Sequence, residues 1–341
     1  MGKEVRIILV DTGSESNHIM MSDIAKLPNA IQISNMYDFR NKFLEVCFKI
    51  HFGFKLNRYF DFPFKSLWDK KNILKKLLSS PDIEYYLILS NDIIRKISNR
   101  YLEKISGLDN VHTFVLLLDS YDFIQPYFKR MIDKVKPERV YSFQESDCHK
   151  YGFNYTNMLY SKSNLTELYN KKKSDFFFVG ADKRRINDIY EIYKKLIKKN
   201  FDCKFIVIVE KRKLRKYTQL YKGIDFRINR VSYRDILNEI ASTRCILELC
   251  QKGQDGLTMR FYEAIFYNKY LLTNNITAMN HELFNSEYMV VFSSPTSLSD
   301  DELDKLKFEK NINYCYKNEM SPIHLVEQML MRKDLNKGFL K

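Results

Sequence analysis

The stretch that decides the fold is CILELC QKGQDGLTMR FYEAIFYNKY LLTNN, residues 245–275. Its apolar start, residues 245–249, predicts a short buried strand, and a polar loop with two glycines follows. A helix comes next, and the apolar run 270–273 predicts a second strand. The stretch therefore reads as one strand–loop–helix–strand unit of an α/β protein.

The loop of this unit delivers backbone N–H groups to a helix N-terminus, where a phosphate is readily bound. Arg260 lies in the first helical turn, where its guanidinium suits a diphosphate. Glu263, three residues later, lies on the same helix face and can accept hydrogen bonds from sugar hydroxyls. The segment thus predicts both halves of a site for a nucleotide diphosphate-sugar.

Length and composition indicate a packed protein of two domains, with 341 residues of which 45% are hydrophobic. The charge is unusual, because 56 basic residues face 42 acidic ones and leave a net charge of +14. Zinc-finger spacing, an RNP-like aromatic motif and a basic region with heptads are all missing, so nucleic acid is not the expected partner. Phosphate-bearing substrates, an anionic membrane surface and a merely solvated lysine surface stay open as explanations.

The N-terminus shows no secretory signal, since Lys3, Glu4 and Arg6 lead directly into a strand-like run. The longest apolar runs, such as 114–118, are far too short to cross a bilayer. Six cysteines without a C-x-x-C pair are expected to be reduced. We therefore expect a cytoplasmic protein, with peripheral attachment to the inner face of the cell membrane as an alternative.

Apolar runs of five to seven residues alternate with helical patterns along both halves of the chain. In the first half the predicted strands are Val5–Val10, Tyr85–Leu89, His112–Leu118 and Arg139–Phe143. The pattern restarts after a run of three lysines, with predicted strands at Asp175–Val179 and Phe205–Val209. Such runs predict parallel sheets covered by helices on both faces.

Two such modules predict an α/β protein with two Rossmann-like domains facing across a cleft. The expected limits are 1–165 for an acceptor-side domain and 172–320 for a nucleotide-sugar-binding domain. A helix and tail complete the chain at 321–341, and the sequence does not say on which domain that helix packs.

A resemblance to a known family rests on LTMRFYEAIFYNKYLLTNN, residues 257–275. This segment resembles the nucleotide-binding segment of group-1-like glycosyltransferases of the GT-B fold, which act in bacterial capsule and lipopolysaccharide biosynthesis. Their pattern is a glycine-containing loop, R-x-x-E-A and a strand, matched at Gly256, Arg260, Glu263, Ala264 and the Leu271-Leu272 strand. The segment SFQESDCHKYGF, residues 142–153, also looks like the last strand of their N-terminal domain and its sequel.

The resemblance implies roles for particular residues. Glu263 would hold the ribose hydroxyls, and the Gly256 loop with Arg260 would hold the diphosphate. Gly180 with Lys183 or Arg184 would approach the same phosphates from the first turn of the C-terminal domain. The full predicted set is Gly180, Lys183, Arg184, Gln254, Asp255, Gly256, Leu257, Thr258, Arg260 and Glu263.

The sequence departs from the family at one position. Many retaining relatives carry two glutamates eight residues apart, but here Asp255 stands eight residues before Glu263. Gln254 or Glu248 could contact the donor sugar instead, and retention or inversion stays open. No D-x-D motif occurs, so we expect cationic side chains rather than a metal ion to stabilise the leaving diphosphate, and no cofactor.

Each predicted site residue has a plainer interpretation. Arg260 and Glu263 could form a surface ion pair, and Lys183, Arg184 and Arg185 could be a charged helix start, although cations there oppose the helix dipole. No metal site is predicted at Glu145, Asp147 and His149, which fit a hydrated loop better.

Asp119 follows a predicted strand of the N-terminal domain and is the candidate catalytic base for a sugar acceptor. A turn or a helix N-cap would explain the same residue. Asp11 and Ser14, after the first strand, could likewise touch the acceptor or simply form a turn.

The run FKSLWDKKNILKKLLS, residues 64–79, predicts a basic amphipathic helix. Its apolar residues Leu67, Trp68, Leu74 and Leu78 would face one way and its lysines another. Such a helix could lie on anionic lipid, or pack on the core with a hydrated basic side.

The sequence therefore favours a GT-B enzyme that moves a sugar from a nucleotide-diphosphate sugar, with UDP preferred, to a lipid-linked or oligosaccharide acceptor. The setting would be bacterial surface polysaccharide assembly. The alternative is a non-catalytic nucleotide- or nucleic-acid-binding protein with the same doubly wound fold.

Overall fold

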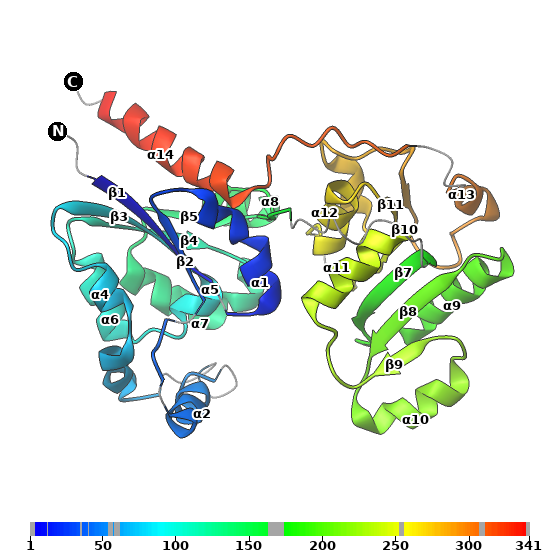
Figure 1. Cartoon of the computed structure of the whole chain (residues 1–341), viewed down its shortest axis with the longest axis horizontal. Helices are drawn as coiled ribbons and strands as arrows, with labels where there is room; N and C mark the ends of the chain where they lie inside the picture. Colours follow the sequence, from blue (N-terminus) through cyan, green and yellow to red (C-terminus); the bar gives the residue numbers. More distant parts are fainter. Residues whose placement is uncertain are drawn as a thin grey trace. The chain divides into compact units, whose positions relative to one another are not determined.

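The chain forms two compact units, one made of residues 1–161 and 319–341 and the other of residues 162–318 (Figure 1). The computed structural model describes residues 4–11, 13–34, 36–39, 41–53, 57, 62–162, 174–251, 256–306 and 311–338. We call the two parts unit 1 and unit 2. The predicted domain limits at 165 and 172 lie outside the described residues.

Unit 1 contains a six-stranded sheet in the order β2-β1-β3-β4-β5-β6, with every described pair parallel. Its strands are β1 (Glu4–Val10), β2 (Ala30–Ile33), β3 (Ile83–Ser90), β4 (Val111–Leu116), β5 (Arg139–Ser142) and β6 (Asn154–Tyr155). The four strands predicted for the first half are confirmed as β1, β3, β4 and β5. The sequence did not indicate β2, whose four residues are mostly half-buried or exposed.

Alternate residues of these strands face opposite layers of helices, as the period of two requires. Ile8 and Val10 pack in one apolar cluster with the helices α5 (Asn91–Ile94), α6 (Asn99–Ser106) and α7 (Tyr121–Val135). Ile7 and Leu9 pack in a second cluster on the other face. The sheet is therefore covered on both sides, as predicted.

The C-terminal helix α14 (Pro322–Gly338) completes that second face of unit 1. Leu325, Val326 and Met329 pack against Ile24 of the short helix η1 (Ser22–Lys26), which follows α1 (Glu15–Met20). The hydroxyl of Ser321 donates to the buried Asp23 carboxylate at 2.9 Å. These contacts answer the question that the sequence left open, because the end of the chain packs on the N-terminal unit.

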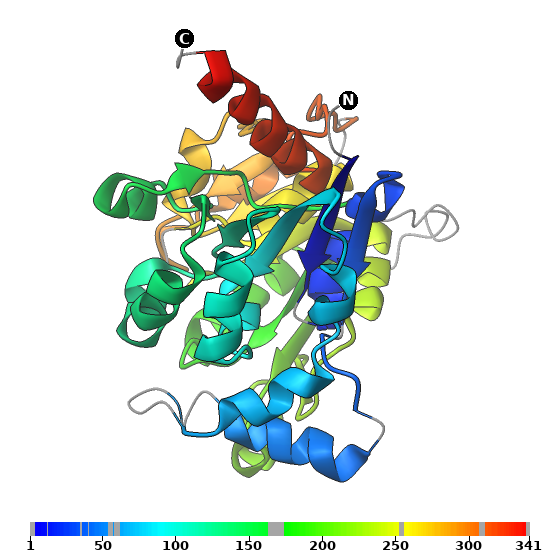
Figure 2. The ribbon, with the colours of Figure 1, turned by 90° about the vertical axis from the view of Figure 1, so that its left-hand side faces the viewer.

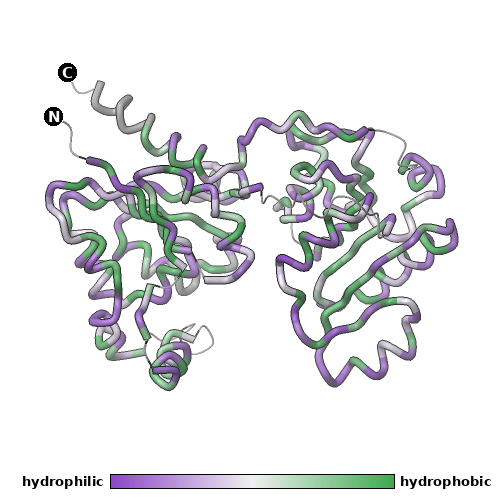
Figure 3. The backbone as a smooth tube through the Cα atoms, in the orientation of Figure 1, coloured by the Kyte–Doolittle hydropathy of each residue, from purple (hydrophilic) through white to green (hydrophobic). Residues whose placement is uncertain are grey.

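Unit 2 contains a second six-stranded parallel sheet, in the order β12-β11-β10-β7-β8-β9. Its strands are β7 (Ser174–Ala181), β8 (Cys203–Ile208), β9 (Asp225–Arg227), β10 (Thr243–Glu248), β11 (Tyr270–Thr273) and β12 (Met289–Val291). Its helices are α9 (Ile186–Lys198), α10 (Lys211–Leu220), α11 (Tyr233–Ser242), α12 (Met259–Phe266), η3 (Ile276–Asn280) and α13 (Asp300–Asp304). Figure 3 shows the hydrophobic strands of each sheet within more hydrophilic helices and loops.

The predicted amphipathic helix over 64–79 is wrong, because the segment divides into the 3₁₀ helix η2 (Lys65–Lys71) and the short helix α4 (Leu74–Leu77). Asn72 is extended between them and its side chain accepts from the N–H of Leu74, which ends one helix and starts the next. Leu67 is 69% exposed while Leu74 is buried, so the two leucines do not share an apolar face. Figure 2 shows η2 beside the helix α2 (Lys42–His51) at one end of unit 1.

The segment after β5 is also not a loop, since it forms the helix α8 (Glu145–Tyr151). Asp147 is buried and accepts from the N–H of Tyr121 at 2.7 Å, which satisfies the first turn of α7. The carboxylate thus joins two helices of unit 1. Within the described part of the chain, no group of three His, Cys, Asp or Glu side chains is arranged to hold a metal ion.

No helix in the described residues is both long and apolar enough to pass through a bilayer.

One buried ammonium group gives the stability of unit 2 a testable pH dependence. Lys269, between α12 and β11, donates to the carbonyl of Ala241 at 2.7 Å, and burial lowers its pKa from 10.5 to about 8. Below this pKa both the folded and the unfolded chain carry the proton, so the cost of burying the charge is fully present. Between 8 and 10.5 the folded chain releases its proton first, and stability rises with pH.

We therefore expect the free energy of unfolding of the unmodified chain, minus that of Lys269→Met, to increase by up to about 3 kcal/mol from about pH 7 to about pH 10. Tyrosines titrate in both proteins and cancel in this difference. Urea unfolding at several pH values measures it. If this difference in the free energy of unfolding does not change with pH, the lowered pKa of Lys269 is contradicted.

Candidate functional site

A cavity of about 1190 Å³ opens at the carboxyl ends of four strands of unit 2. This is the edge of a doubly wound sheet at which ligands bind in such folds. Its volume lies slightly above the range of small-molecule sites, about 300–1,000 Å³. The loops after β7, β10, β11 and β12 line it, with Lys183, Arg184, Gln251, Asn274, Thr277 and Ser294 among their residues.

Two exposed cations stand on the β7 side of this cavity. Lys183 and Arg184 both have positive φ, 40° and 65°, and the N–H of Arg185 donates to the carbonyl of Asp182 at 2.8 Å. The two cations are therefore the central residues of a β-turn, and both are exposed. Neither cation forms an ion pair with a described acidic residue, so both are available to an anion in the cavity.

The side chain of Arg185, unlike those of Lys183 and Arg184, is hydrogen-bonded to the protein backbone. Its guanidinium donates to the carbonyls of Ala181 and Leu249, and it lies 5.9 Å from the ring centre of Phe178. It therefore ties the end of β7 to the end of β10, and burial lowers its pKa. Gly180 makes room for this arrangement, because a Cβ there would lie 2.9 Å from the Arg185 guanidinium.

Glu248, the last residue of β10, is a buried carboxylate that joins three segments. One oxygen accepts from the hydroxyl of Thr258 and the other from that of Thr273. Burial raises the pKa of Glu248, and these hydroxyls, with Arg260, oppose the rise. Since Glu248 is 2% exposed, it holds the cavity loops in place and does not reach the cavity in this conformation.

Two asparagines after β11 hold the two ends of the loop that follows β10. The Asn274 side chain accepts from the N–H of Cys250 at 2.6 Å and donates to the Cys250 carbonyl at 3.3 Å. Asn275 donates to the carbonyl of Gly256 at 3.1 Å and caps η3 through the N–H of Thr277. The sequence analysis missed both residues, although the dipeptide after an apolar strand could have indicated them.

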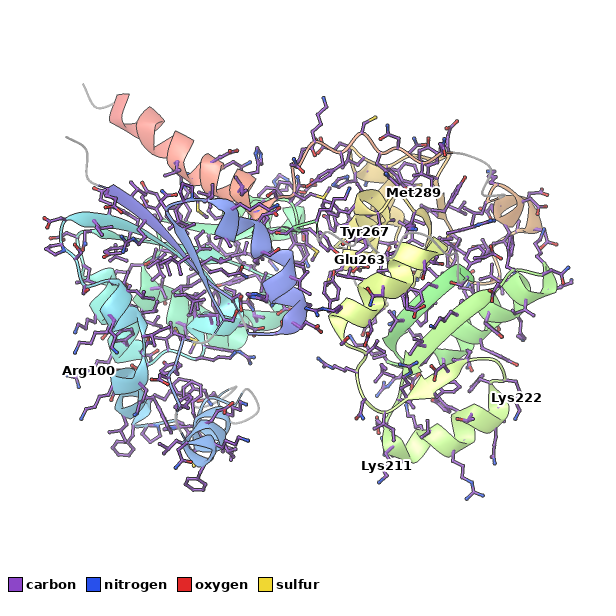
Figure 4. All side chains as sticks on the ribbon, in the orientation of Figure 1. Arg100, Lys211, Lys222, Glu263, Tyr267 and Met289 are labelled. Carbon is purple, nitrogen blue, oxygen red and sulfur yellow. The ribbon has the colours of Figure 1, made fainter. Side chains whose placement is uncertain are left out.

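Arg260 and Glu263 form an ion pair inside unit 2. Glu263 belongs to α12 (labelled in Figure 4) and has no exposed surface. Its carboxylate accepts from the Arg260 guanidinium and from the hydroxyl of Tyr233, the latter at 2.9 Å. Burial raises the pKa of Glu263, opposed by these two partners. The two residues therefore do not form a surface ion pair. Contact of Glu263 with a ribose stays a prediction, and it would require the hydrogen bond to Arg260 or to Tyr233 to break.

The remaining residues of the predicted loop lie around the start of α12. Thr258 is its N-cap and accepts from the N–H of Arg260 at 3.1 Å, while Gly256 and Leu257 precede it, half-buried. Gln254 and Asp255 lie outside the described residues. Of the predicted set, the structure therefore places Lys183 and Arg184 on the cavity wall, while Gly180 lies near the end of β7 against Arg185.

In unit 1, the candidate base Asp119 lies at the end of the loop after β4. The residue as a whole is exposed, and its carboxylate accepts from the side-chain amide of Asn91 at 3.4 Å. Desolvation by the surrounding protein raises its pKa, and repulsion from Asp92 adds to the rise. The first N–H group of α7, that of Tyr121, donates to Asp147 and not to Asp119.

A second group of polar side chains in unit 1 surrounds Asp11, at the end of β1. The buried Asp11 carboxylate accepts from Gly13 N–H at 2.7 Å, from Gln32 at 2.9 Å and from the Ser34 hydroxyl at 2.9 Å. It also lies 3.1 Å from Nδ1 of His18, whose side chain is 55% exposed. The Ser34 hydroxyl lies 2.8 Å from the same nitrogen, so a neutral ring that donates from Nδ1 has Nε2 as its acceptor.

Ser34 connects this group with a cavity of about 620 Å³ in the same unit. The cavity is also lined by Glu45 and Phe48 of α2 and by Lys96, whose pKa is lowered by burial. The sequence indicated that Asp11 could touch the acceptor or form a turn. It did not indicate the partners of the carboxylate, because they come from α1, from β2 and from the residue after β2.

The fold is shared with solved proteins that are distant in sequence. An α-glucosyltransferase in complex with UDP and a 13-mer DNA containing an HMU base superposes with a TM-score of 0.54, at 9% identity over 90% of each chain. A putative UDP-N-acetylglucosamine 2-epimerase from Listeria monocytogenes gives 0.51, at 8% identity over 96% of this chain and 95% of that one. The predicted GT-B fold, with two Rossmann-like domains, is thereby confirmed.

No protein-family model matches the chain, and no curated protein matches it in sequence.

The close packing around Gly180 gives a direct test of the cavity wall. Gly180→Ala places a methyl group 2.9 Å from the end of the Arg185 guanidinium and 3.1 Å from the Phe178 ring. Arg185 can move away only by giving up a hydrogen bond to Ala181 or Leu249, so we expect a loss of about 1 kcal/mol in the free energy of unfolding. Gly107→Ala is the matched control, because its new Cβ would be no nearer than 3.5 Å to a neighbour. Equal effects of the two substitutions in urea unfolding would contradict the role given to Gly180.

Proposed function

We propose that the chain is a glycosyltransferase that binds a nucleotide-diphosphate sugar in the cavity of unit 2. The observation that supports this most is the position of Lys183 and Arg184, two exposed cations without a described acidic partner, at the carboxyl edge of a parallel sheet. Helix α9 begins directly after them, so its first N–H groups add to the positive potential. A diphosphate is the ligand that this combination suits.

UDP is our preferred nucleotide. The α-glucosyltransferase that shares this fold was solved with UDP, which supports extending that ligand to this cavity. Amide and hydroxyl groups such as those of Gln251, Asn274 and Thr277 line the wall and can hydrogen-bond a base or a sugar.

In sugar transfer the bond between the anomeric carbon and the diphosphate breaks, and negative charge grows on the leaving diphosphate. Lys183 and Arg184 are positioned to stabilise that charge without a metal ion. We therefore propose metal-independent transfer. In the described conformation, Arg260 and Glu263 bind each other and stabilise the loop before α12, and they do not contact the ligand.

Unit 1 would supply the acceptor side. Its 620 Å³ cavity is large enough for a sugar, and we propose a glycan or a lipid-linked acceptor in surface polysaccharide assembly. Two groups of this unit can take the acceptor proton: Asp119, as predicted from the sequence, and His18 held by Asp11.

The donor site is tested by calorimetry with UDP in the presence of EDTA. We expect Lys183→Gln/Arg184→Gln to weaken binding by about 10–100-fold, through the loss of charge-assisted hydrogen bonds. Lys211→Gln/Lys222→Gln removes the same charge at the two ends of α10 and should bind UDP like the unmodified chain (Figure 4).

If both double variants bind UDP equally weakly, the loss reflects the net charge of the protein and not a contact of Lys183 or Arg184 with UDP. Duplex DNA binding without any affinity for UDP would support the non-catalytic alternative. Conversion of a UDP-sugar to its epimer without transfer would instead favour the reaction named for the second fold relative.

The proton acceptor is tested by activity. If His18 is the base, His18→Gln should lower the rate of sugar transfer by about 10²–10⁴-fold and leave UDP affinity unchanged, because His18 lies in unit 1. His149→Gln, an exposed histidine of α8 in the same unit, is the control. The same loss in Asp119→Asn, with His18→Gln active, would assign the role to Asp119.

A further inference from the structure

The helix α2 of unit 1 is apolar on two sides, and only one of them packs on the protein. On the inner side, Phe48 is buried, with its ring centre 5.5 Å from that of Trp68 and 4.5 Å from that of Tyr37. On the outer side, Phe43, Val46 and Ile50 are 70%, 52% and 57% exposed. Their spacing of three and four residues places them on one stripe of the helix.

The neighbouring helix η2 and the residue before it carry further exposed apolar side chains. Phe64 and Leu67 are 73% and 69% exposed, and Phe64 has a positive φ of 63°. Seven of the fourteen exposed large apolar side chains in the described part of the chain lie between residues 43 and 67. This concentration exceeds the scattered apolar residues of an ordinary surface.

The two helices form one substructure. The indole N–H of Trp68 donates to Nδ1 of His51 at 2.9 Å, and Nε2 of His51 lies 2.8 Å from the carbonyl oxygen of Pro63. Phe64 therefore follows directly on a residue that is hydrogen-bonded to the end of α2. Figure 2 shows α2 and η2 side by side at this end of unit 1.

The same region is strongly basic. Between residues 41 and 80 the sequence has nine Lys or Arg and three Asp or Glu. Lys70, Lys71, Lys75 and Lys76 of η2 and α4 are exposed, and none of them forms an ion pair with a described acidic residue. Exposed lysines and exposed apolar side chains thus occur together on α2, η2 and α4.

From this combination we infer that α2, η2 and α4 form a surface that docks on an anionic membrane. The outer stripe of α2 with Phe64 and Leu67 would enter the boundary between headgroups and acyl chains, and the four lysines would attract anionic headgroups. A protein partner with an apolar groove would satisfy the stripe but would leave the lysines unexplained.

The surface also gives the proposed acceptor a physical location. Glu45, Phe48 and Lys49 of α2 line the 620 Å³ cavity, while Phe43, Val46 and Ile50 of the same helix face outward. A membrane bound to the outer stripe would lie one helix away from that cavity. This favours a lipid-linked acceptor over a free oligosaccharide, a point that rests on the proposed sugar transfer, whereas the docking itself does not.

The test is co-sedimentation of the full chain with vesicles of phosphatidylcholine alone or mixed in equal parts with phosphatidylglycerol. The unmodified chain should bind the anionic vesicles, more strongly at low salt than at high salt. Phe43→Gln/Val46→Gln/Ile50→Gln should reduce the partition coefficient at least tenfold at both salt concentrations. Substitution of Lys70, Lys71, Lys75 and Lys76 by Gln should remove the preference for the anionic vesicles.

Two matched controls lie in unit 2. Ile197→Gln/Leu220→Gln/Ile228→Gln changes three residues that are 42–55% exposed, and substitution of Lys198, Lys211, Lys216 and Lys222 by Gln removes four exposed charges. Both controls should bind vesicles like the unmodified chain. Phe64→Gln/Leu67→Gln provides a second test of the surface if the α2 variant does not fold.

Trp68 offers an independent readout, since it is the single tryptophan of the chain and packs from η2 onto α2. Brominated lipids should quench its fluorescence in the unmodified chain and not in the α2 variant. Absence of vesicle binding, equal binding by the α2 variant, an equal loss in the controls, or binding without quenching would each overturn the inference. If the unmodified chain binds anionic vesicles but does not bind UDP, the proposed function is overturned and the membrane docking stands.

Discussion

A buried carboxylate at the end of β10 is the contact on which the candidate site depends. Glu248 accepts hydrogen bonds from Thr258, at the start of α12, and from Thr273, at the end of β11. A buried carboxylate is costly unless it is hydrogen-bonded, so the three segments are held in one arrangement. Asn274 and Asn275 extend this network to both ends of the following loop. The cavity at this edge of the sheet is the space that these bonds keep open.

The charges around that cavity fall into two groups with different tasks. Arg185, Arg260 and Glu263 are engaged by protein atoms, and they join strands and helices. Lys183 and Arg184 have no described acidic partner and face the cavity. Rigid internal pairs beside available cations make a preorganised anion site, because few protein groups need to move when a diphosphate arrives. Unit 1 shows the same division, with the Asp11 carboxylate buried and the His18 ring half exposed.

The sequence predicted the sheets well because their strands are buried on both faces. Runs such as DFFFV and CILEL are continuous, and a parallel sheet covered by helices requires such runs. Strands β2, β6, β9 and β12 were missed because each has only two to four residues, too few for a periodic pattern. The helix over 64–79 was wrongly predicted because Asn72 interrupts it. The hydrogen bond from the N–H of Leu74 to the Asn72 side chain is local, and the hydrophobic periodicity does not reveal it. For the site, the resemblance to group-1-like glycosyltransferases implied that Lys183 or Arg184 approaches the phosphates. The roles of Glu248, Asn274 and His18 depend on partners distant in sequence, which a single chain does not show.

The central claim is that the carboxyl edge of the unit 2 sheet binds a nucleoside diphosphate. Hydrogen–deuterium exchange of the full chain, with and without UDP, tests it most directly. The account predicts slower exchange in the four loops at residues 182–185, 249–251, 274–277 and 293–295, with uridine giving a much smaller effect. Unchanged exchange in these loops at saturating UDP, or protection confined to unit 1, would contradict it.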